Sequence, residues 1–127
     1  MGYETGSGYE HLISLDIESQ MYTRNATCYI RIPFTVSGNP EEFVFMTLNI
    51  RYDDGFIAYI NGVEVARRNF TGRAAWSSAA SADHVDAEAE QLEGIDISTS
   101  LNLLQRGANL LAIQGMNSSA TSGDFLI

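Results

Sequence analysis

The chain has 127 residues, of which 45% are hydrophobic, and it carries a formal net charge of −9 without a single lysine. This length suits one domain with a two-layer core, so we expect a single module over 1–127. An acidic surface repels polyanions, which excludes nucleic acid and anionic membranes as expected partners. It also disfavours acidic polysaccharides unless a local arginine cluster or a bound cation intervenes. No apolar run reaches the length of a membrane span, and the lone Cys28 allows no internal disulfide.

The first clear strand follows a loosely patterned opening. Residues 1–8 contain Gly and Ser and are expected to be flexible, and 9–24 is a mixture of loop and strand. Residues 27–36 then alternate with the two-residue period of a strand, and Pro33 falls on the more polar face, which favours an edge position or a bulge. The apolar face comprises Ile30, Ile32, Phe34 and Val36.

The most informative segment runs from 48 to 66, where strand, acidic turn, strand, Asn-Gly turn and strand follow one another. The alternation begins at Val44, so we expect a half-buried strand over 44–52. Asn61 and Gly62 tolerate the positive φ angles of a type I′ hairpin turn. This turn predicts a register in which Ile60 faces Val63, Ala58 faces Val65 and Phe56 faces Arg67.

The acidic turn Asp53-Asp54-Gly55 lacks the ligand spacing of a calcium-binding EF-hand loop. Adjacent carboxylates at a strand turn more often accept hydrogen bonds from backbone amides. We therefore expect Asp53 and Asp54 to hold this corner of the fold in place.

The second half of the chain begins with its least regular part, 67–91, which is rich in Ala and Ser. A loop of this length in a compact domain is usually functional or disordered. Strands are expected at 92–97 and 110–116, and 124–127 is expected to pair at an edge. One helical turn is predicted at 101–104, capped by Ser98 or Ser100 and closed by Gly107.

Two segments resemble galactose-binding-like β-sandwich (jelly-roll) modules of large secreted bacterial proteins. Residues 52–67, Y-D-D-G-F-I-A-Y-I-N-G-V-E-V-A-R, resemble the D-D-G-x-x-x-Y-x-N-G hairpin of domains attached to glycoside hydrolases. Residues 107–117, G-A-N-L-L-A-I-Q-G-M-N, resemble the G-x-N-x-x-A-x-x-x-x-N strand of such modules. Similar modules occur beside lamin-tail and spore-coat-H-like domains. The resemblance covers about 8–127 and implies an all-β antiparallel sandwich with at most one short helical turn.

The resemblance also implies a place outside the cell. No export signal is visible, and the chain stops on the strand-like residues 125–127. We therefore expect a monomeric module excised from a longer secreted or cell-surface protein, in which it adjoins other domains.

Trp76 is the strongest candidate for ligand binding. It stands in an Ala- and Ser-rich loop with little apolar sequence to bury it, and an exposed indole offers a flat face to a sugar ring. Further ligand-binding candidates are Arg73, His84, Asp86 and Arg68, and adjacent arginines such as Arg67 and Arg68 suit carboxylate or sulfate. In the competing interpretation, Trp76 plugs one end of the sandwich.

Two functions follow from these observations. The first is a non-catalytic carbohydrate-binding module that targets a secreted or surface enzyme to polysaccharide. The second is a structural or adhesion spacer without a glycan ligand, which a buried Trp76 or a flat surface without a pocket beside it would favour. Catalysis is not expected, because His11 and His84 belong to no Ser, Cys or acid pattern and no motif singles out a carboxylate pair.

A structural calcium ion is the one expected cofactor. Residues 83–90 hold four carboxylates and one histidine, so Asp83 belongs to a segment that suits a hard cation, although a solvated acidic loop explains it as well. The resemblance implies calcium where the first and last strands meet, and Asp124 with Glu10 would suit that place. The sequence leaves both places open.

Overall fold

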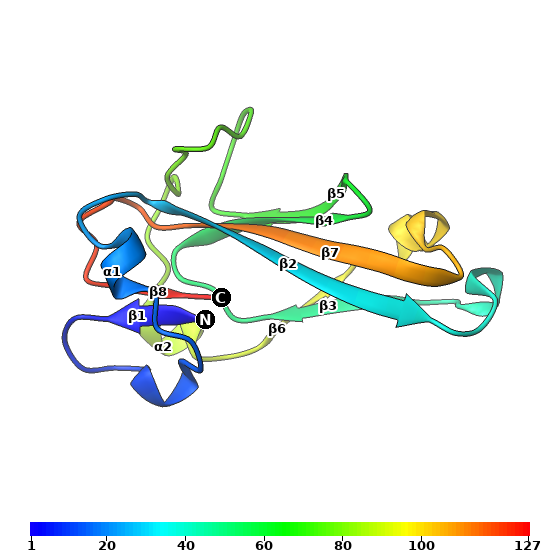
Figure 1. Cartoon of the computed structure of the whole chain (residues 1–127), viewed down its shortest axis with the longest axis horizontal. Helices are drawn as coiled ribbons and strands as arrows, with labels where there is room; N and C mark the ends of the chain where they lie inside the picture. Colours follow the sequence, from blue (N-terminus) through cyan, green and yellow to red (C-terminus); the bar gives the residue numbers. More distant parts are fainter.

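Eight strands form two layers of antiparallel sheet in the computed structural model, which describes all of residues 1–127 (Figure 1). One layer is a four-stranded sheet of order β2-β7-β4-β5, with β2 at Thr27–Val36, β7 at Gly107–Met116, β4 at Gly55–Ile60 and β5 at Val63–Arg68. The other layer holds two pairs: β3 (Thr47–Ile50) with β6 (Glu93–Asp96), and β1 (Gly2–Glu4) with β8 (Asp124–Leu126). The expected all-β antiparallel sandwich is confirmed.

The main core lies between the four-stranded sheet and the pair β3-β6. Leu48 and Ile50 of β3 and Ile95 of β6 are buried against Phe56 and Ile113 of the larger sheet. A second, smaller core beside β1 and β8 contains Tyr3, Ile17, Met21 and Phe125. Gly115 of β7 is required here, because a Cβ at this position would come within 2.7 Å of Cζ of Phe125.

The four-stranded sheet has an inner face toward these cores and an opposite face that we call the outer face. Ile30 of β2 belongs to the inner face and packs against the main core, so its neighbours Tyr29 and Arg31 point outward. Pro33 also points outward from β2, which is an edge strand as the sequence predicts. The outer face comprises Thr27, Tyr29, Arg31, Pro33, Leu110, Ala112, Gln114, Met116, Ile57, Tyr59, Glu64 and Arg67.

The predicted hairpin forms, but its register departs from the prediction after two residues. Asn61 and Gly62 have φ angles of 50° and 87°, and Ile60 pairs with Val63 as expected. A bulge between Ala58 and Tyr59 then shifts the pairing. Because a bulge inserts one extra residue, Ala58 pairs with Ala66 instead of Val65, and Phe56 pairs with Arg68 instead of Arg67. Arg67 therefore lies on the outer face and Arg68 on the inner side.

Two boundary predictions are wrong, the first of them because tertiary packing outweighs local composition. Gly2–Glu4, expected within a flexible opening, form β1 and pair with β8, since burial of the Tyr3 ring fixes them. The strand expected from Val44 begins only at Thr47, and Val44 is 83% exposed.

The chain also has more helical turns than the single one expected. A helical turn is present near the predicted place as η3, a 3₁₀ helix at Ser98–Leu103, but it begins three residues earlier than expected, and neither Ser98 nor Ser100 caps it, because its N-cap residue is Ile97. Four other short helices occur where the chain reverses between strands: η1 (Glu10–Leu12), α1 (Glu18–Met21), η2 (Pro40–Glu42) and α2 (Asp86–Ala89). The Asn39 side chain caps η2, since its Oδ1 accepts from Glu41 N, and Asp16 Oδ1 accepts from Glu18 N just before α1.

Candidate functional site

Trp76 is displayed on a hydrogen-bonded turn, residues 75–78, which we call the Trp76 turn. Ala75 N donates to Ser78 Oγ at 2.9 Å, and Ser78 N donates to Ala75 O at 3.2 Å. The indole itself is 74% exposed. The interpretation of Trp76 as a buried plug is therefore wrong.

The Trp76 turn is fastened to the outer face of the four-stranded sheet. Gln114 Nε2 of β7 donates to Ala75 O at 2.8 Å, and Thr27 Oγ1 of β2 donates to Ser78 O. Beneath the loop that carries the turn, Ile57 and Met116 are fully buried. The exposed indole thus stands on a rigid base.

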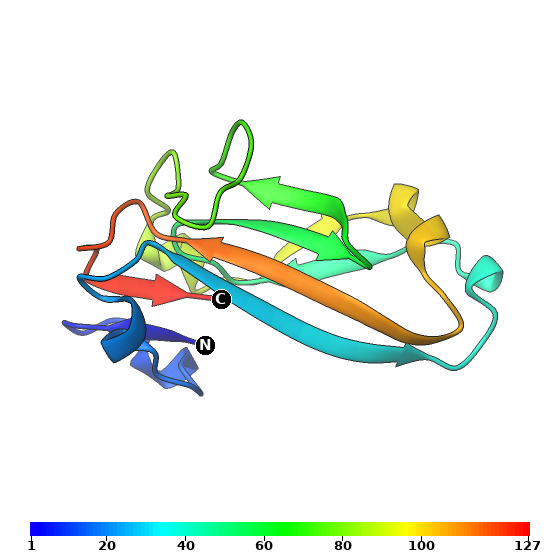
Figure 2. The same cartoon turned by 45° about the horizontal axis from the view of Figure 1, so that its top comes forward.

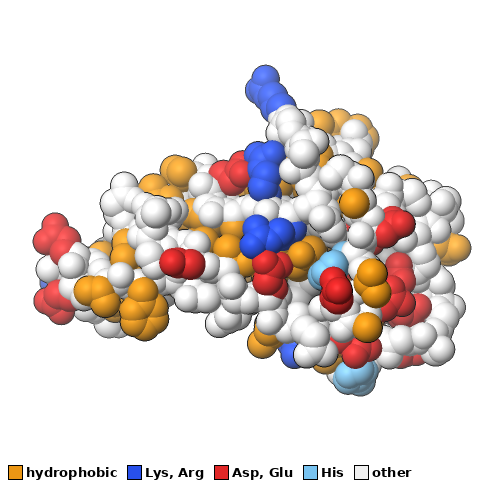
Figure 3. Space-filling model, turned by 180° about the vertical axis from the view of Figure 1, so that it is seen from behind, with side chains coloured by type: hydrophobic (Ala, Val, Ile, Leu, Met, Phe, Trp, Pro, Cys, Tyr) orange, Lys and Arg blue, Asp and Glu red, His pale blue; other side chains and the backbone are white.

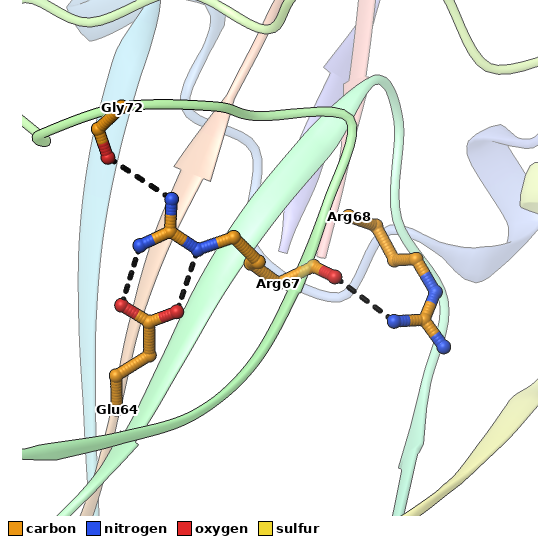
Figure 4. Close-up of polar contacts among 4 residues, drawn as sticks. All are labelled: Glu64, Arg67, Arg68 and Gly72. Carbon is orange, nitrogen blue, oxygen red and sulfur yellow. Dashed lines mark hydrogen bonds and ion pairs between the residues drawn. The ribbon is translucent and has the colours of Figure 1, made fainter.

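The rest of the loop is held in the same way. Arg67 donates to Gly72 O at 3.0 Å, near the start of the loop (Figure 4). Ala80 N donates to Asn117 O at 2.8 Å, near its end. Figure 2 shows the loop after β5 rising beside the four-stranded sheet, away from β1 and β8.

The structure divides the predicted ligand-binding residues between two places. Arg73 is exposed three residues before Trp76 in the same loop. Arg68 instead points away from Arg67 (Figure 4), and its Nε and Nη2 donate to Oε1 of Glu93 in the opposite layer, at 2.8 and 2.6 Å. Arg68 therefore joins the two layers and does not border the Trp76 turn.

His84 and Asp86 belong to the second place. The His84 ring stacks on Tyr52 with centroids 4.2 Å apart, and its Nδ1 lies 2.8 Å from Tyr52 O. Burial, followed by hydrogen bonding to Glu93, raises the pKa of Tyr52 to about 12. Asp86 is the first residue of α2. The pKa of Asp124 is raised, first by burial of its own carboxyl group and second by the negative charge of Asp86. Figure 3, which views the molecule from behind, shows arginine, acidic and histidine side chains close together on that face.

The arginines differ in whether their guanidinium groups are available. Arg67 forms a two-pronged ion pair with Glu64, with both nitrogen–oxygen distances at 2.6 Å (Figure 4), and Arg68 is paired with Glu93. Arg31 and Arg73 are exposed and form no hydrogen bond or ion pair. Of the arginines near the loop, these two are free to meet an anionic ligand.

Sequence reasoning missed the residues that surround the Trp76 turn on the outer face. Tyr29 is 51% exposed and pairs with Gln114, the residue that anchors the turn. Arg31 follows on the same face, and Tyr59 lies across Ala112 from it. The two-residue alternation of β2 carried this signal, because Tyr29 and Arg31 occupy the positions opposite Ile30 and Ile32.

The buried carboxylates of the acidic turn are structural. Asp54 Oδ1 accepts from His84 N at 2.9 Å and its Oδ2 accepts from Ser118 N at 2.7 Å, which confirms the predicted corner role. Asp53 accepts instead from the Tyr9 hydroxyl, at 2.5 Å. Burial raises the pKa of Asp53 to about 8, and the neighbouring charge of Asp54 contributes to this shift. Neither carboxylate lines a cleft.

The predicted calcium ligands do not form a ligand set. No three His, Cys, Asp or Glu side chains are grouped so as to hold a metal ion. Glu10 is exposed in η1 and accepts a hydrogen bond from Gly8 N at 3.0 Å. Asp124 begins β8 and accepts a hydrogen bond from the Ser122 hydroxyl. Asp83 is exposed in the loop before α2.

An apolar cleft of about 350 Å³ opens between the two layers, beside β2 and β3. Of its thirteen lining residues eleven are hydrophobic, and the two polar ones are Asn49 and Arg51. A sugar needs several polar partners for its hydroxyl groups, so this cleft is poorly suited to a glycan. None of the clefts in the structure is lined by Trp76.

Comparisons with family models, with curated proteins and with solved structures find no match to this chain. All helices of this protein are too short to span a bilayer. The geometry of the outer face and the Trp76 turn is therefore the basis for a functional proposal.

Proposed function

We propose that this protein is a non-catalytic carbohydrate-binding module that binds polysaccharide by stacking a sugar ring on Trp76. The observation that carries the proposal is the 74% exposed indole on a turn that is hydrogen-bonded internally and to the sheet. An exposed aromatic ring costs hydration free energy in the unbound protein, but it can stack on a sugar ring when a glycan binds. A preformed site also loses little conformational freedom on binding.

The surroundings of Trp76 provide polar partners for a sugar. Ser77 follows Trp76 and is exposed, and the guanidinium of Arg73 has no partner within the chain. Hydroxyl and guanidinium groups at the edge of an aromatic face are the groups that orient a stacked sugar. In this proposal the module is a monomer that belongs, with other domains, to a longer secreted or surface protein. There it holds an enzyme near its polysaccharide. These parts of the proposal rest on the resemblance to galactose-binding-like modules.

A structural or adhesion spacer is the second candidate function, and two observations favour it. Residues of the matched motifs serve the fold itself: Asn61 Nδ2 donates to Leu103 O and Asn109 Oδ1, and Asn117 Nδ2 donates to Asp124 O. In addition, no cleft adjoins Trp76. The test below therefore has to separate a spacer from a glycan-binding module.

The test is affinity electrophoresis of the wild type, Trp76→Ala and Phe45→Ala against neutral and acidic polysaccharides. Phe45 is the matched control, because it is also 74% exposed but precedes β3. We expect Trp76→Ala to weaken binding at least about 10-fold, equivalent to about 1.4 kcal/mol, and Phe45→Ala to leave it unchanged. Equal retardation of all three proteins would place the site elsewhere. No retardation of the wild type by any polysaccharide would favour the spacer.

Calcium stays a prediction, since Asp124, Glu10 and Asp83 do not come together as a ligand set in this arrangement. If these residues bind the ion, added calcium must raise the melting temperature and a chelator must lower it, because a ligand selective for the folded state stabilises that state. Calorimetry with calcium and with chelator measures this. Identical melting temperatures would rule out a structural calcium ion.

A further inference from the structure

Tyr29 and the Trp76 turn meet at one residue of the central strand β7. Tyr29 of β2 pairs with Gln114, and Gln114 Nε2 donates to Ala75 O immediately before Trp76. Both aromatic side chains are exposed, Tyr29 to 51% and Trp76 to 74%. Two exposed aromatic side chains are therefore linked to the same residue of β7, Tyr29 by strand pairing and Trp76 through the turn that carries it.

Arg31 extends this arrangement along β2. It lies two residues beyond Tyr29 on the same face, a separation of about 7 Å along a strand. Its neighbour across the sheet is Ala112, and Tyr59 lies on the far side of Ala112. The guanidinium of Arg31 is thus unpaired, with Tyr29 and Pro33 as neighbours along β2, Ala112 as its neighbour across the sheet and Tyr59 beyond Ala112.

The outer face and the loop over it are basic, although the protein is strongly acidic. Together with loop residues 69–82, this face holds three of the seven basic residues but only one of the sixteen acidic residues. The acidic residue is Glu64, and its charge is already paired with Arg67. The unpaired charges that remain here are positive, on Arg31 and Arg73.

This local charge selects the ligand. A protein of net charge −9 repels a polyanion over most of its surface, so an acidic ligand approaches this face more favourably than the surfaces that carry most of the acidic residues. A guanidinium binds a carboxylate through two parallel hydrogen bonds, and an aromatic face stacks on a sugar ring. A polymer of uronic acids presents a carboxylate and a stackable ring in every unit.

We infer that the outer face around Tyr29, Arg31 and Trp76 binds an acidic polysaccharide containing uronic acid. Tyr29 and Trp76 stack on sugar rings, and the guanidinium groups of Arg31 and Arg73 bind the carboxylates. This inference rests on the proposed glycan binding at Trp76 and adds the ligand class and two residues, Tyr29 and Arg31, to that site.

The experiment is isothermal titration calorimetry with polygalacturonate and with the same polymer after chemical reduction of its carboxyl groups. We expect the wild type to bind the parent polymer at least about 10-fold more tightly than the reduced polymer, and increasingly weakly as salt rises. Arg31→Gln should lose most of this preference and should bind the reduced polymer as the wild type does. Arg106→Gln is the matched control, because Arg106 is exposed, unpaired and precedes β7, and it should keep the preference.

The outcomes separate this inference from the proposed function. Equal wild-type binding to both polymers would overturn the preference for uronic acid and leave glycan binding in place. The same loss in Arg31→Gln and Arg106→Gln would show a response to net charge and overturn the site. Binding of a single-stranded DNA oligomer as tight as that of polygalacturonate would overturn the ligand class. If the wild type bound neither polygalacturonate, nor its reduced form, nor any neutral polysaccharide, the proposed function itself would be rejected.

Discussion

Two neighbouring carboxylates, Asp53 and Asp54, are buried at one corner of the sandwich but have different partners. Asp54 accepts two backbone N–H groups, from His84 and Ser118, so its charge is satisfied by donors. Asp53 accepts from the single hydroxyl of Tyr9, and burial raises its pKa to about 8. At this corner, burial disfavours a charge on Asp53, while the Asp54 side chain has two backbone donors.

The raised pKa of Asp53 predicts how stability depends on pH. The ordinary value is 3.8, so between about pH 4 and pH 8 the folded state binds more protons than the unfolded state. The contribution of this carboxyl to stability is full below about pH 4 and is lost as the pH rises through about 8. Asp53→Asn should remove this dependence and be more stable than the wild type at pH 8.5, by about 1 kcal/mol or more.

Urea unfolding at pH 5, 7 and 8.5 measures this effect, and Asp54→Asn is the matched control. In Asp54→Asn, an NH₂ group would face a backbone N–H, such as that of Ser118, which in the wild type donates to a carboxylate oxygen. We therefore expect the free energy of unfolding to fall by about 2–3 kcal/mol at pH 7. An unchanged pH dependence in Asp53→Asn would contradict the raised pKa of Asp53.

At this scale the sequence predicts some residues well and others poorly. The corner role of Asp54 follows from turn chemistry, which is local. The opposite orientations of Arg67 and Arg68 could not be predicted, because the bulge between Ala58 and Tyr59 reverses the faces of the residues beyond it. The position of the His84 ring depends in turn on its stacking against Tyr52, which is distant in sequence.

At the scale of elements, the loop between β5 and α2 owes its shape to the sheet beneath it. Gln114 of β7 and Thr27 of β2 both donate to carbonyl groups of the Trp76 turn. Without these bonds the Ala- and Ser-rich segment has few apolar side chains to hold it. The position of the indole therefore depends on two strands that are distant in sequence.

Gln114→Leu tests this dependence. The substitution leaves Ala75 O without its donor, so the loop should open more often and trypsin should cut after Arg73 several-fold faster than in the wild type. Limited proteolysis followed by mass spectrometry measures the rate at that bond. Gln105→Leu is the control, because Gln105 is exposed and bonds only through its backbone. Equal cleavage in the wild type and Gln114→Leu would show that the sheet does not hold the turn.

The longer strands could be predicted and the short elements could not. The strand at Thr27–Val36 and the β4–β5 hairpin follow from strong alternation and an Asn-Gly turn. The three residues of β1 and the single turns such as α1 have no comparable local signal. Their stability comes from packing, as the burial of Tyr3 shows.

At the scale of the whole molecule, charge is distributed unevenly over a single sandwich. The outer face and loop residues 69–82 hold three of the seven basic residues and one of the sixteen acidic residues, and the rest of the molecule carries the remaining acidic charge. Composition predicts the total charge but not this distribution, since the distribution depends on which strand faces point outward. The local arginine group that would admit an acidic polysaccharide thus became visible only in the fold.

The central claim, that glycan binds at Trp76, has a direct spectroscopic test because this is the only tryptophan in the chain. The measurement is acrylamide quenching of tryptophan fluorescence with and without a saturating amount of a polysaccharide that retards the protein in electrophoresis. Stacking on the indole predicts a blue-shifted emission and quenching reduced several-fold, because the 74% exposed ring becomes covered. Unchanged emission and quenching at saturation would show that the glycan binds elsewhere and would contradict the claim.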